Sequence, residues 1–295
     1  MEWNHSVPST ALIASMVSWL DAVKQRQQQS EVLSSQPIHS RDLVHRMADL
    51  IHKDRFRIVV QPVIDLQTHA IVGGEVNSRL DHPEQGLLFP GKFLSAVEEA
   101  GLHSHFDHYI FWKTCALMQR LSRNGIGIQY LSCNFNRKTL SEKDITARLA
   151  EVADSFGIRR EQLALEITER EQETDSGQFY GNIHQLKEAG FRIFVDDLGA
   201  GVTSLRDLWS YPVDVMKIDR ALLPAADDEF GKNAYASLRN FVADLGIKVL
   251  CEGVETEAQH HFVLGVGCHY GQGFRFYHPM EEERFLCLMG EENWL

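Results

Sequence analysis

The chain has 295 residues, of which 44% are hydrophobic and 24% charged, and its formal net charge is −12. This size and composition fit one large domain or two small ones with an ample core. The acidic balance argues against an electrostatic grip on a nucleic-acid backbone. The five cysteines form no CxxC pair, which favours a reducing compartment.

Residues 1–40 are predicted to form an N-terminal helix and a linker. Leu12, Ile13 and Met16 fall on one face of an uncharged stretch. This stretch is too short for a membrane span and lacks the basic start of a signal peptide. The helix either packs on its own domain or binds a second copy or another protein. The polar residues 24–37 are interpreted as the linker.

From residue 41 the chain alternates between helical and strand-like segments. Helices are expected near 41–54, 90–101, 104–124, 142–156, 176–190, 200–209, 230–245, 255–264 and 281–289. Strands are expected near 56–66, 70–80, 128–134, 163–168, 192–196, 213–218, 247–251 and 268–273. Gly125, Gly157, Gly190 and Gly246 stand between a helix and the next strand, as C-cap glycines do. Such βα units predict a mostly parallel sheet, and roughly eight strands favour a closed α/β barrel.

Six apolar runs in this region end in an acid, an amide or a lysine. The residues at these ends are Glu75, Asn134, Glu166, Asp196 with Asp197, Lys217 and Glu252. In a barrel of parallel strands, all the carboxyl ends open onto the face that holds the active site. Hard divalent cations prefer oxygen ligands, so acids and an amide gathered there predict a metal-dependent enzyme.

Residues 41–295 resemble the EAL domain, a family of cyclic di-GMP phosphodiesterases. Seven blocks carry the resemblance in order: QPVIDLQTHAIVGGEVNSRL, LSCNFN, LALEITE, FVDDLGAGVTSL, VDVMKIDR, CEGVETEAQ and GQGFRFYHPM. The resemblance implies a TIM-like (βα)8 barrel with one antiparallel strand. It also implies hydrolysis of cyclic di-GMP to linear pGpG with two Mg²⁺ or Mn²⁺ ions.

The resemblance assigns roles to individual residues. The implied metal ligands are Glu75, Asn134, Glu166 and Asp196 for one ion, and Asp196, Asp197 and Glu252 for the other. The implied catalytic residues are Glu252, Lys217, Asp197 and Glu169, and the implied substrate contacts are Gln61, Arg79, Gln272 and Glu255.

Each of these residues also has a structural interpretation. The acids at strand ends could cap helices or face solvent, and Lys217 could extend to water from a barrel rim. Glu169 could interact with a helix dipole, and Arg79 could form a surface ion pair. Glu252 is either a ligand of the second ion or a general base, and geometry must decide between these roles.

The chain departs from the family at its signature, where Glu-Ala-Leu is replaced by Glu75-Val76-Asn77. Asn77 brings an amide to a position where an apolar side chain usually packs. A buried amide without a partner would cost about 1–3 kcal/mol, unless it contacts a guanine edge or a phosphate. The loop at 198–202 also differs from the family pattern.

Three functions follow from these observations. The first is an active cyclic di-GMP phosphodiesterase of the bacterial cytoplasm, which the resemblance implies to be a homodimer. The second is a degenerate EAL domain that binds the nucleotide or a protein without turnover, and the third is a two-metal hydrolase of another phosphodiester. No nucleic-acid partner and no membrane span are expected.

Overall fold

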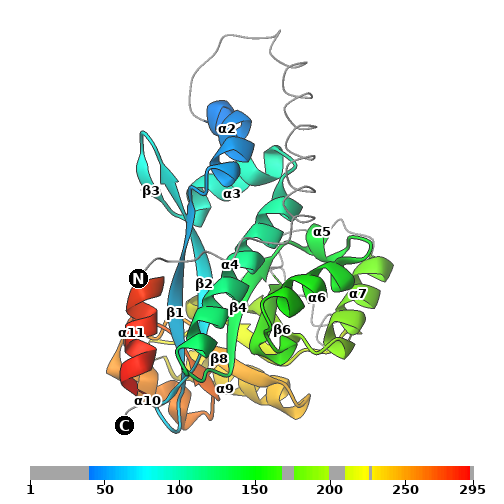
Figure 1. Cartoon of the computed structure of the whole chain (residues 1–295). Helices are drawn as coiled ribbons and strands as arrows, with labels where there is room; N and C mark the ends of the chain where they lie inside the picture. Colours follow the sequence, from blue (N-terminus) through cyan, green and yellow to red (C-terminus); the bar gives the residue numbers. More distant parts are fainter. Residues whose placement is uncertain (1–39, 168–175, 199–209, 226–227, 293–295) are drawn as a thin grey trace. The chain divides into compact units, whose positions relative to one another are not determined.

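The computed structural model describes residues 40–167, 176–198, 210–225 and 228–292 (Figure 1). The predicted N-terminal helix and linker, and the predicted helix over 200–209, lie outside these residues. The chain divides into two compact units, each described separately below. One comprises the residues up to Phe56 with Leu80–Leu102, and the other comprises Arg57–Arg79 with His103–Leu295.

In the first unit, two helices pack together beside a short hairpin. The helices are α2 (Ser40–His52) and α3 (Pro90–Glu99). The end of β2 (Ile71–His82) pairs antiparallel with β3 (Gly86–Leu88). Phe93 of α3 is fully buried, and its ring meets the ring of Phe56 edge to face at 5.2 Å.

The second unit is a closed barrel. Its remaining strands are β1 (Phe56–Asp65), β4 (Tyr130–Phe135), β5 (Leu163–Ile167), β6 (Arg192–Leu198), β7 (Val215–Ile218), β8 (Lys248–Cys251) and β9 (Tyr270–Gly271). The strand order is β1-β9-β8-β7-β6-β5-β4-β2, and pairing of β1 with β2 closes the ring. Neighbouring strands from β2 to β9 run parallel, whereas β1 is antiparallel to β9. The predicted barrel with one reversed strand is therefore confirmed.

Helices connect the barrel strands and pack outside them. They are α4 (His103–Arg123), α5 (Arg137–Leu140), α6 (Ile145–Ser155), α7 (Ser176–Glu188), α9 (Glu229–Asp244), α10 (Glu257–Gly265) and α11 (Glu282–Glu292). Two 3-10 helices, η1 (Arg160–Gln162) and η2 (Arg220–Leu222), and the short strand β10 (Met280–Glu281) complete the unit. Helix α4 packs on β4, α7 on β6 and α9 on β8 (Figure 1).

The predicted helix-ending glycines are confirmed. Gly125, Gly157, Gly190 and Gly246 all have positive φ, between 67° and 101°. Glycine adopts this left-handed conformation without the steric cost that a Cβ imposes. Each of them therefore ends a helix and turns the chain toward the next strand.

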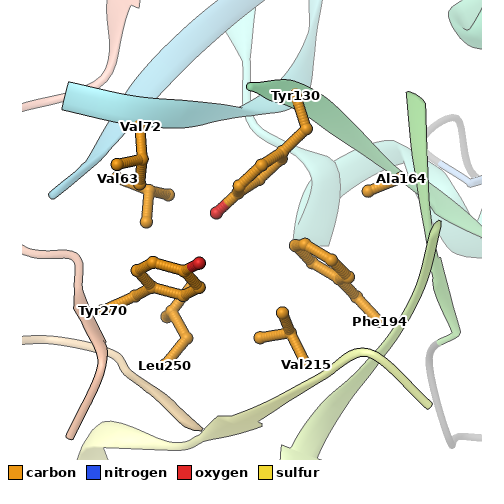
Figure 2. Packing of buried hydrophobic residues seen from close by; sticks show 8 residues of the cluster. All are labelled: Val63, Val72, Tyr130, Ala164, Phe194, Val215, Leu250 and Tyr270. Atoms are coloured by element: carbon orange, nitrogen blue, oxygen red, sulfur yellow. The ribbon is translucent and has the colours of Figure 1, made fainter. Parts of the chain in front are cut away.

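Figure 2 shows an apolar layer inside the barrel, formed by side chains that point toward one another from facing strands. Its members are Val63, Val72, Tyr130, Ala164, Phe194, Val215, Leu250 and Tyr270. Tyr130 meets Phe194 edge to face, with ring centroids 4.9 Å apart. Its ring needs a glycine opposite, because a Cβ on Gly73 would lie 2.5 Å from the Tyr130 Cζ atom.

This apolar layer forms the floor of the candidate site. Alternate residues on a strand share a face, so the residue two positions closer to the site lies above the same interior. On the reversed strand β1 this residue comes earlier in the chain. The pairs of floor residue and overlying residue are Val63 and Gln61, Ala164 and Glu166, Phe194 and Asp196, Val215 and Lys217, Leu250 and Glu252, and Tyr270 and Gln272. At six strands, the inward-facing side chain thus changes from apolar to polar within two residues.

Candidate functional site

Lys217, at the end of β7, lies at the centre of a cluster of acids. Its Nζ atom is 2.7 Å from Glu252 Oε1, 2.9 Å from Glu166 Oε2, 3.4 Å from Glu75 Oε2 and 3.5 Å from Asp196 Oδ1. Three of the carboxylates lie on β2, β5 and β6 and that of Glu252 directly follows β8, and the lysine side chain is 1% exposed. The alternative in which Lys217 extends to water is therefore wrong.

Three amides extend the cluster around Glu75. Gln272 Nε2 donates to Glu75 Oε2 at 2.9 Å and to Gln61 Oε1 at 3.3 Å. Gln61 in turn donates to the carbonyl oxygen of Tyr277 at 3.1 Å. Asn134 Nδ2 lies 3.5 Å from Glu75 Oε1, a long contact at the limit of hydrogen bonding. The structure thus brings Asn134, Gln61 and Gln272 to the predicted acids.

The unusual Asn77 belongs to this polar layer. It lies two residues beyond Glu75 on the same face of β2, is partly buried, and its amide helps to hold the pKa of the Glu75 carboxyl below the usual value. The side chain is only partly buried and its amide stabilises the Glu75 carboxylate, so the cost expected for a fully buried, unpaired amide does not apply.

Burial and mutual repulsion set the protonation of the acids. Burial is the largest cause that raises the pKa of Glu166 to about 7 and that of Glu252 to about 8, against the attraction of Lys217. Burial raises the pKa of Glu75, but the charge of Lys217, the hydrogen bond from Gln272 and the Asn77 amide together hold it below the usual value. Burial lowers the pKa of Lys217, yet the four carboxylates more than compensate and leave it well above normal. One ammonium does not balance four carboxylates, so the site favours additional positive charge.

A cavity of about 190 Å³ opens beside the cluster, at the carboxyl ends of the strands. Five of the predicted site residues line it: Gln61, Glu75, Glu252, Glu255 and Gln272. Asp219, Arg220 and Phe274 line it as well, and the sequence analysis did not single them out. The cavity therefore joins two of the predicted metal ligands, Glu75 and Glu252, to three of the predicted substrate contacts.

Arg79 is placed differently from these residues. It is buried on β2, on the same side of the strand as Glu75, and its Nη1 donates to the Ser78 carbonyl at 2.8 Å. Burial lowers its pKa, while the charges of Glu281 and Glu75 raise it. Its burial contradicts the alternative of a surface ion pair.

Two predicted residues cannot be placed as side chains. Glu169 lies outside the described residues, and Asp197 is described only as backbone of β6. Along β6 the pairing with β7 shifts register between Val195 and Leu198, on either side of the aspartate pair. Such an irregularity changes the strict alternation of neighbouring side chains and is frequent beside active sites.

The residues fit a divalent-cation site in their chemistry. Among the described residues, no group of three or more His, Cys, Asp or Glu side chains is arranged to hold a metal ion. The acids instead converge on the Lys217 ammonium. They nevertheless supply several hard oxygen donors, which Mg²⁺ and Mn²⁺ prefer. Gln272 Oε1 is also buried without a hydrogen-bond partner in the described part of the chain, so another oxygen faces the site unused.

The fold and the site define a TIM-like barrel protein with an oxygen-rich pocket, suited to cations, at the carboxyl ends of its strands. Residues 44–279 match the EAL domain. The chain belongs to the EAL domain family, which includes cyclic di-GMP phosphodiesterases.

Individual relatives are consistent with this assignment. The probable cyclic di-GMP phosphodiesterase PdeB of Escherichia coli (strain K12) is 29% identical over 242 residues, which cover 82% of this chain and 46% of PdeB. The bifunctional diguanylate cyclase/cyclic di-GMP phosphodiesterase MucR of Pseudomonas aeruginosa is 27% identical over 245 residues, 83% of this chain and 36% of MucR. The chain thus spans less than half the length of these curated relatives.

Solved structures share the fold. The PaMucR phosphodiesterase in complex with c-di-GMP superimposes with a TM-score of 0.76 at 26% identity, over 83% of this chain and 99% of that one. The EAL enzyme Bd1971, in its cAMP and cyclic-di-GMP bound form, gives a TM-score of 0.79 at 22% identity, over 96% and 77%. The second likeness concerns the fold alone. Within the described residues, no helix combines the length and apolar character needed to cross a bilayer.

Proposed function

We propose that this chain hydrolyses one phosphodiester bond of cyclic di-GMP to give linear pGpG, with two Mg²⁺ or Mn²⁺ ions. The observation that carries the proposal is the position of Lys217, whose ammonium contacts four carboxylates that lie on, or directly after, four different strands. This cluster borders a cavity on the face where barrel enzymes hold their active sites.

The acids and amides of the cluster are the proposed cation ligands. Glu75, Asn134, Glu166 and Asp196 would hold one ion, and Asp196, Asp197 and Glu252 the other. When bound, the two cations supply Lewis-acid activation of the attacking water and stabilise the leaving oxygen. The register shift in β6 supports a shared role for the consecutive Asp196 and Asp197.

Glu252 and Lys217 are the proposed groups for proton and charge transfer. Glu252 lines the cavity and accepts from Lys217 at 2.7 Å. Burial raises its pKa to about 8, and a general base works best when its pKa lies near the working pH. Glu252 would take the proton of the attacking water, while Lys217 stabilises negative charge that develops nearby.

The remaining predicted residues are assigned to the substrate and to support of the site. Gln61, Gln272 and Glu255 line the cavity and would contact the nucleotide. Arg79 would bind a phosphate through charge-assisted hydrogen bonds. Glu169 is proposed to steady the loop that follows the aspartate pair. A homodimer in the bacterial cytoplasm, where cyclic di-GMP is a signal, is part of the same proposal, and so is a partner role for the N-terminal helix.

A second function, binding without turnover, is favoured by one observation. The Asn77 amide stabilises the Glu75 carboxylate, whose oxygens are the proposed cation ligands. Because an amide proton and a cation compete for the same oxygen lone pairs, Asn77 opposes cation binding at Glu75. The chain would then be a receptor that holds cyclic di-GMP without metal.

Product chromatography separates the two functions. Purified protein is incubated with cyclic di-GMP and Mg²⁺ or Mn²⁺, with and without a chelator, beside Glu75→Ala and the control Glu151→Ala. Glu151 is an exposed acid of α6 that does not line the cavity. The proposal expects pGpG from the unmutated chain and the control only, and only with metal. Binding without product in either metal would instead establish the receptor.

A further inference from the structure

One wall of the cavity is an aromatic side chain that the proposed chemistry does not use. Phe274 follows β9 and is 52% exposed, although it lines the cavity beside Gln272. An exposed phenylalanine in a loop gains little for the stability of the fold, because its apolar surface stays in water. Its position in the pocket therefore suggests a role in binding.

The backbone holds Phe274 in a fixed place. The Val254 N–H donates to the Gln272 carbonyl at 3.1 Å, and the Arg275 N–H donates to the Val254 carbonyl at 2.9 Å. Gly273 lies between these bonds, where a Cβ would come within 2.2 Å of the Val254 carbonyl oxygen. Only glycine fits so tight an approach, and the close packing fixes the direction in which Phe274 leaves the loop.

A second ring supports Phe274. His278 stacks on it with ring centroids 4.2 Å apart and an interplanar angle of 27°. The exposed half of the Phe274 side chain thus belongs to a ring that is supported from one side by His278. A rigid, supported aromatic ring that borders a polar cavity is the arrangement that nucleotide-binding proteins use to stack bases.

Groups near Phe274 match a purine that carries hydrogen-bond donors. Glu255 lines the same cavity, is half exposed and lies 3.5 Å from the Arg220 guanidinium. A carboxylate accepts the N–H donors on the edge of guanine, and a guanidinium contacts phosphate oxygens. Phe274, as a stacking surface, and the proposed reacting groups Glu75 and Glu252 therefore line the same cavity.

We infer that Phe274, backed by His278, is the surface on which a guanine base of the substrate stacks, and that it contributes binding rather than chemistry. This inference rests on the proposed cyclic di-GMP function. It adds a residue that sets affinity for the base and that is not itself one of the groups assigned to metal or proton transfer.

The test compares Phe274→Ala, Phe274→Leu and Phe274→Trp with the control Phe230→Ala. Phe230 is also an exposed phenylalanine, 85% exposed on α9, and does not line the cavity. Binding of cyclic di-GMP is measured by calorimetry in chelator, and KM and kcat are measured with Mn²⁺. Loss of one base–aromatic stack is expected to weaken binding and raise KM by roughly 5- to 150-fold, with kcat little changed.

The outcomes distinguish the inference from the function on which it rests. Phe274→Leu should lose nearly as much affinity as Phe274→Ala, Phe274→Trp should retain it, and Phe230→Ala should bind as the unmutated chain does. If the unmutated chain binds or cleaves cyclic di-GMP and Phe274→Ala or Phe274→Leu does so equally well, only the stacking inference is overturned. If the unmutated chain neither binds nor cleaves it, the proposed function and the inference both fall. Thermal melting of each variant checks that the fold is intact.

Discussion

Replacing Lys217 by methionine is expected to destabilise the metal-free protein strongly. Methionine keeps the length and apolar stem of lysine but removes the ammonium that contacts four carboxylates between 2.7 and 3.5 Å. Loss of one partner from a buried ion pair costs about 3–5 kcal/mol, because the remaining charge stays buried. For a chain of this size, that corresponds to a fall in Tm on the order of 10 °C.

The loss should depend on pH. Without Lys217, the pKa values of Glu166 and Glu252, already about 7 and about 8, rise further. A carboxyl group whose pKa is higher in the folded than in the unfolded state destabilises the fold as pH increases through that range. The difference in stability between Lys217→Met and the unmutated chain should therefore be small near pH 5 and largest near pH 8. Added Mn²⁺ should reduce it, since a divalent cation replaces the missing charge.

Thermal melts by circular dichroism, in chelator and in Mn²⁺ from pH 5 to pH 8, test this prediction. The control is Lys187→Met, which removes a half-exposed lysine of α7 that pairs with one acid, Asp214. A pair of this kind contributes about 0–1 kcal/mol. If Lys217→Met in chelator at pH 8 has the same Tm as the control, the ammonium does not hold the acids together, and the account of the site is wrong.

Three other changes probe the floor, the signature and a partly buried histidine. Gly73→Ala should destabilise the fold by about 1–3 kcal/mol in urea denaturation, because its Cβ would lie 2.5 Å from the confined Tyr130 ring. Adding Tyr130→Leu to Gly73→Ala should restore part of this loss. A double variant in which the two single losses simply add would argue against the clash. Asn77→Leu should lower the Mn²⁺ concentration needed for half-maximal activity by up to about tenfold, because it removes an amide that stabilises the Glu75 carboxylate in the absence of metal; a higher Mn²⁺ requirement would contradict the competition between this amide and the cation. Burial, followed by the charge of His108, lowers the pKa of His105 to about 4, so stability should fall as pH drops from about 6.5 toward 4. After allowance for partial exposure the loss at pH 5 is about 1 kcal/mol, and His105→Gln should abolish it; an unchanged pH profile in that variant would assign the loss to other groups.

The barrel could be predicted because each βα unit carries its own signals. Apolar runs, amphipathic helices and helix-ending glycines such as Gly125 and Gly157 are local features, and the structure confirms them. The short elements β3, α5 and β10 were missed, since two to four residues are too few to show a period. The strands β3 and β10 form by pairing with β2 and β1, whereas α5 is a single turn capped by the Asn136 side chain.

The site could be predicted only as a set of residues. Acids at strand ends indicated that Glu75, Glu166, Asp196 and Glu252 would meet on one face, because parallel strands share that face. The sequence did not reveal that Lys217 lies at the centre, since this depends on strand stagger around the closed barrel.

Asn77 on β2 and the cavity residue Phe274 show why the arrangement of the site does not follow from the sequence. From the sequence, Asn77 is expected to be either a misfit in an apolar position or a contact to guanine or phosphate. The structure places it, partly buried, on the same face of β2 as Glu75, where its amide helps to lower the pKa of that carboxyl. Phe274 stands in a loop without periodicity, and its exposure follows from backbone bonds to Val254 that no local pattern encodes.

The most direct test of the central claim is mass spectrometry of the product formed in ¹⁸O-labelled water. Protein, cyclic di-GMP and Mn²⁺ are incubated together, with Glu75→Ala as the inactive control. The account predicts pGpG that is one water heavier than the substrate and carries a single ¹⁸O on its terminal phosphate. Recovery of unlabelled cyclic di-GMP from a folded protein that binds it would contradict hydrolysis and establish the chain as a receptor.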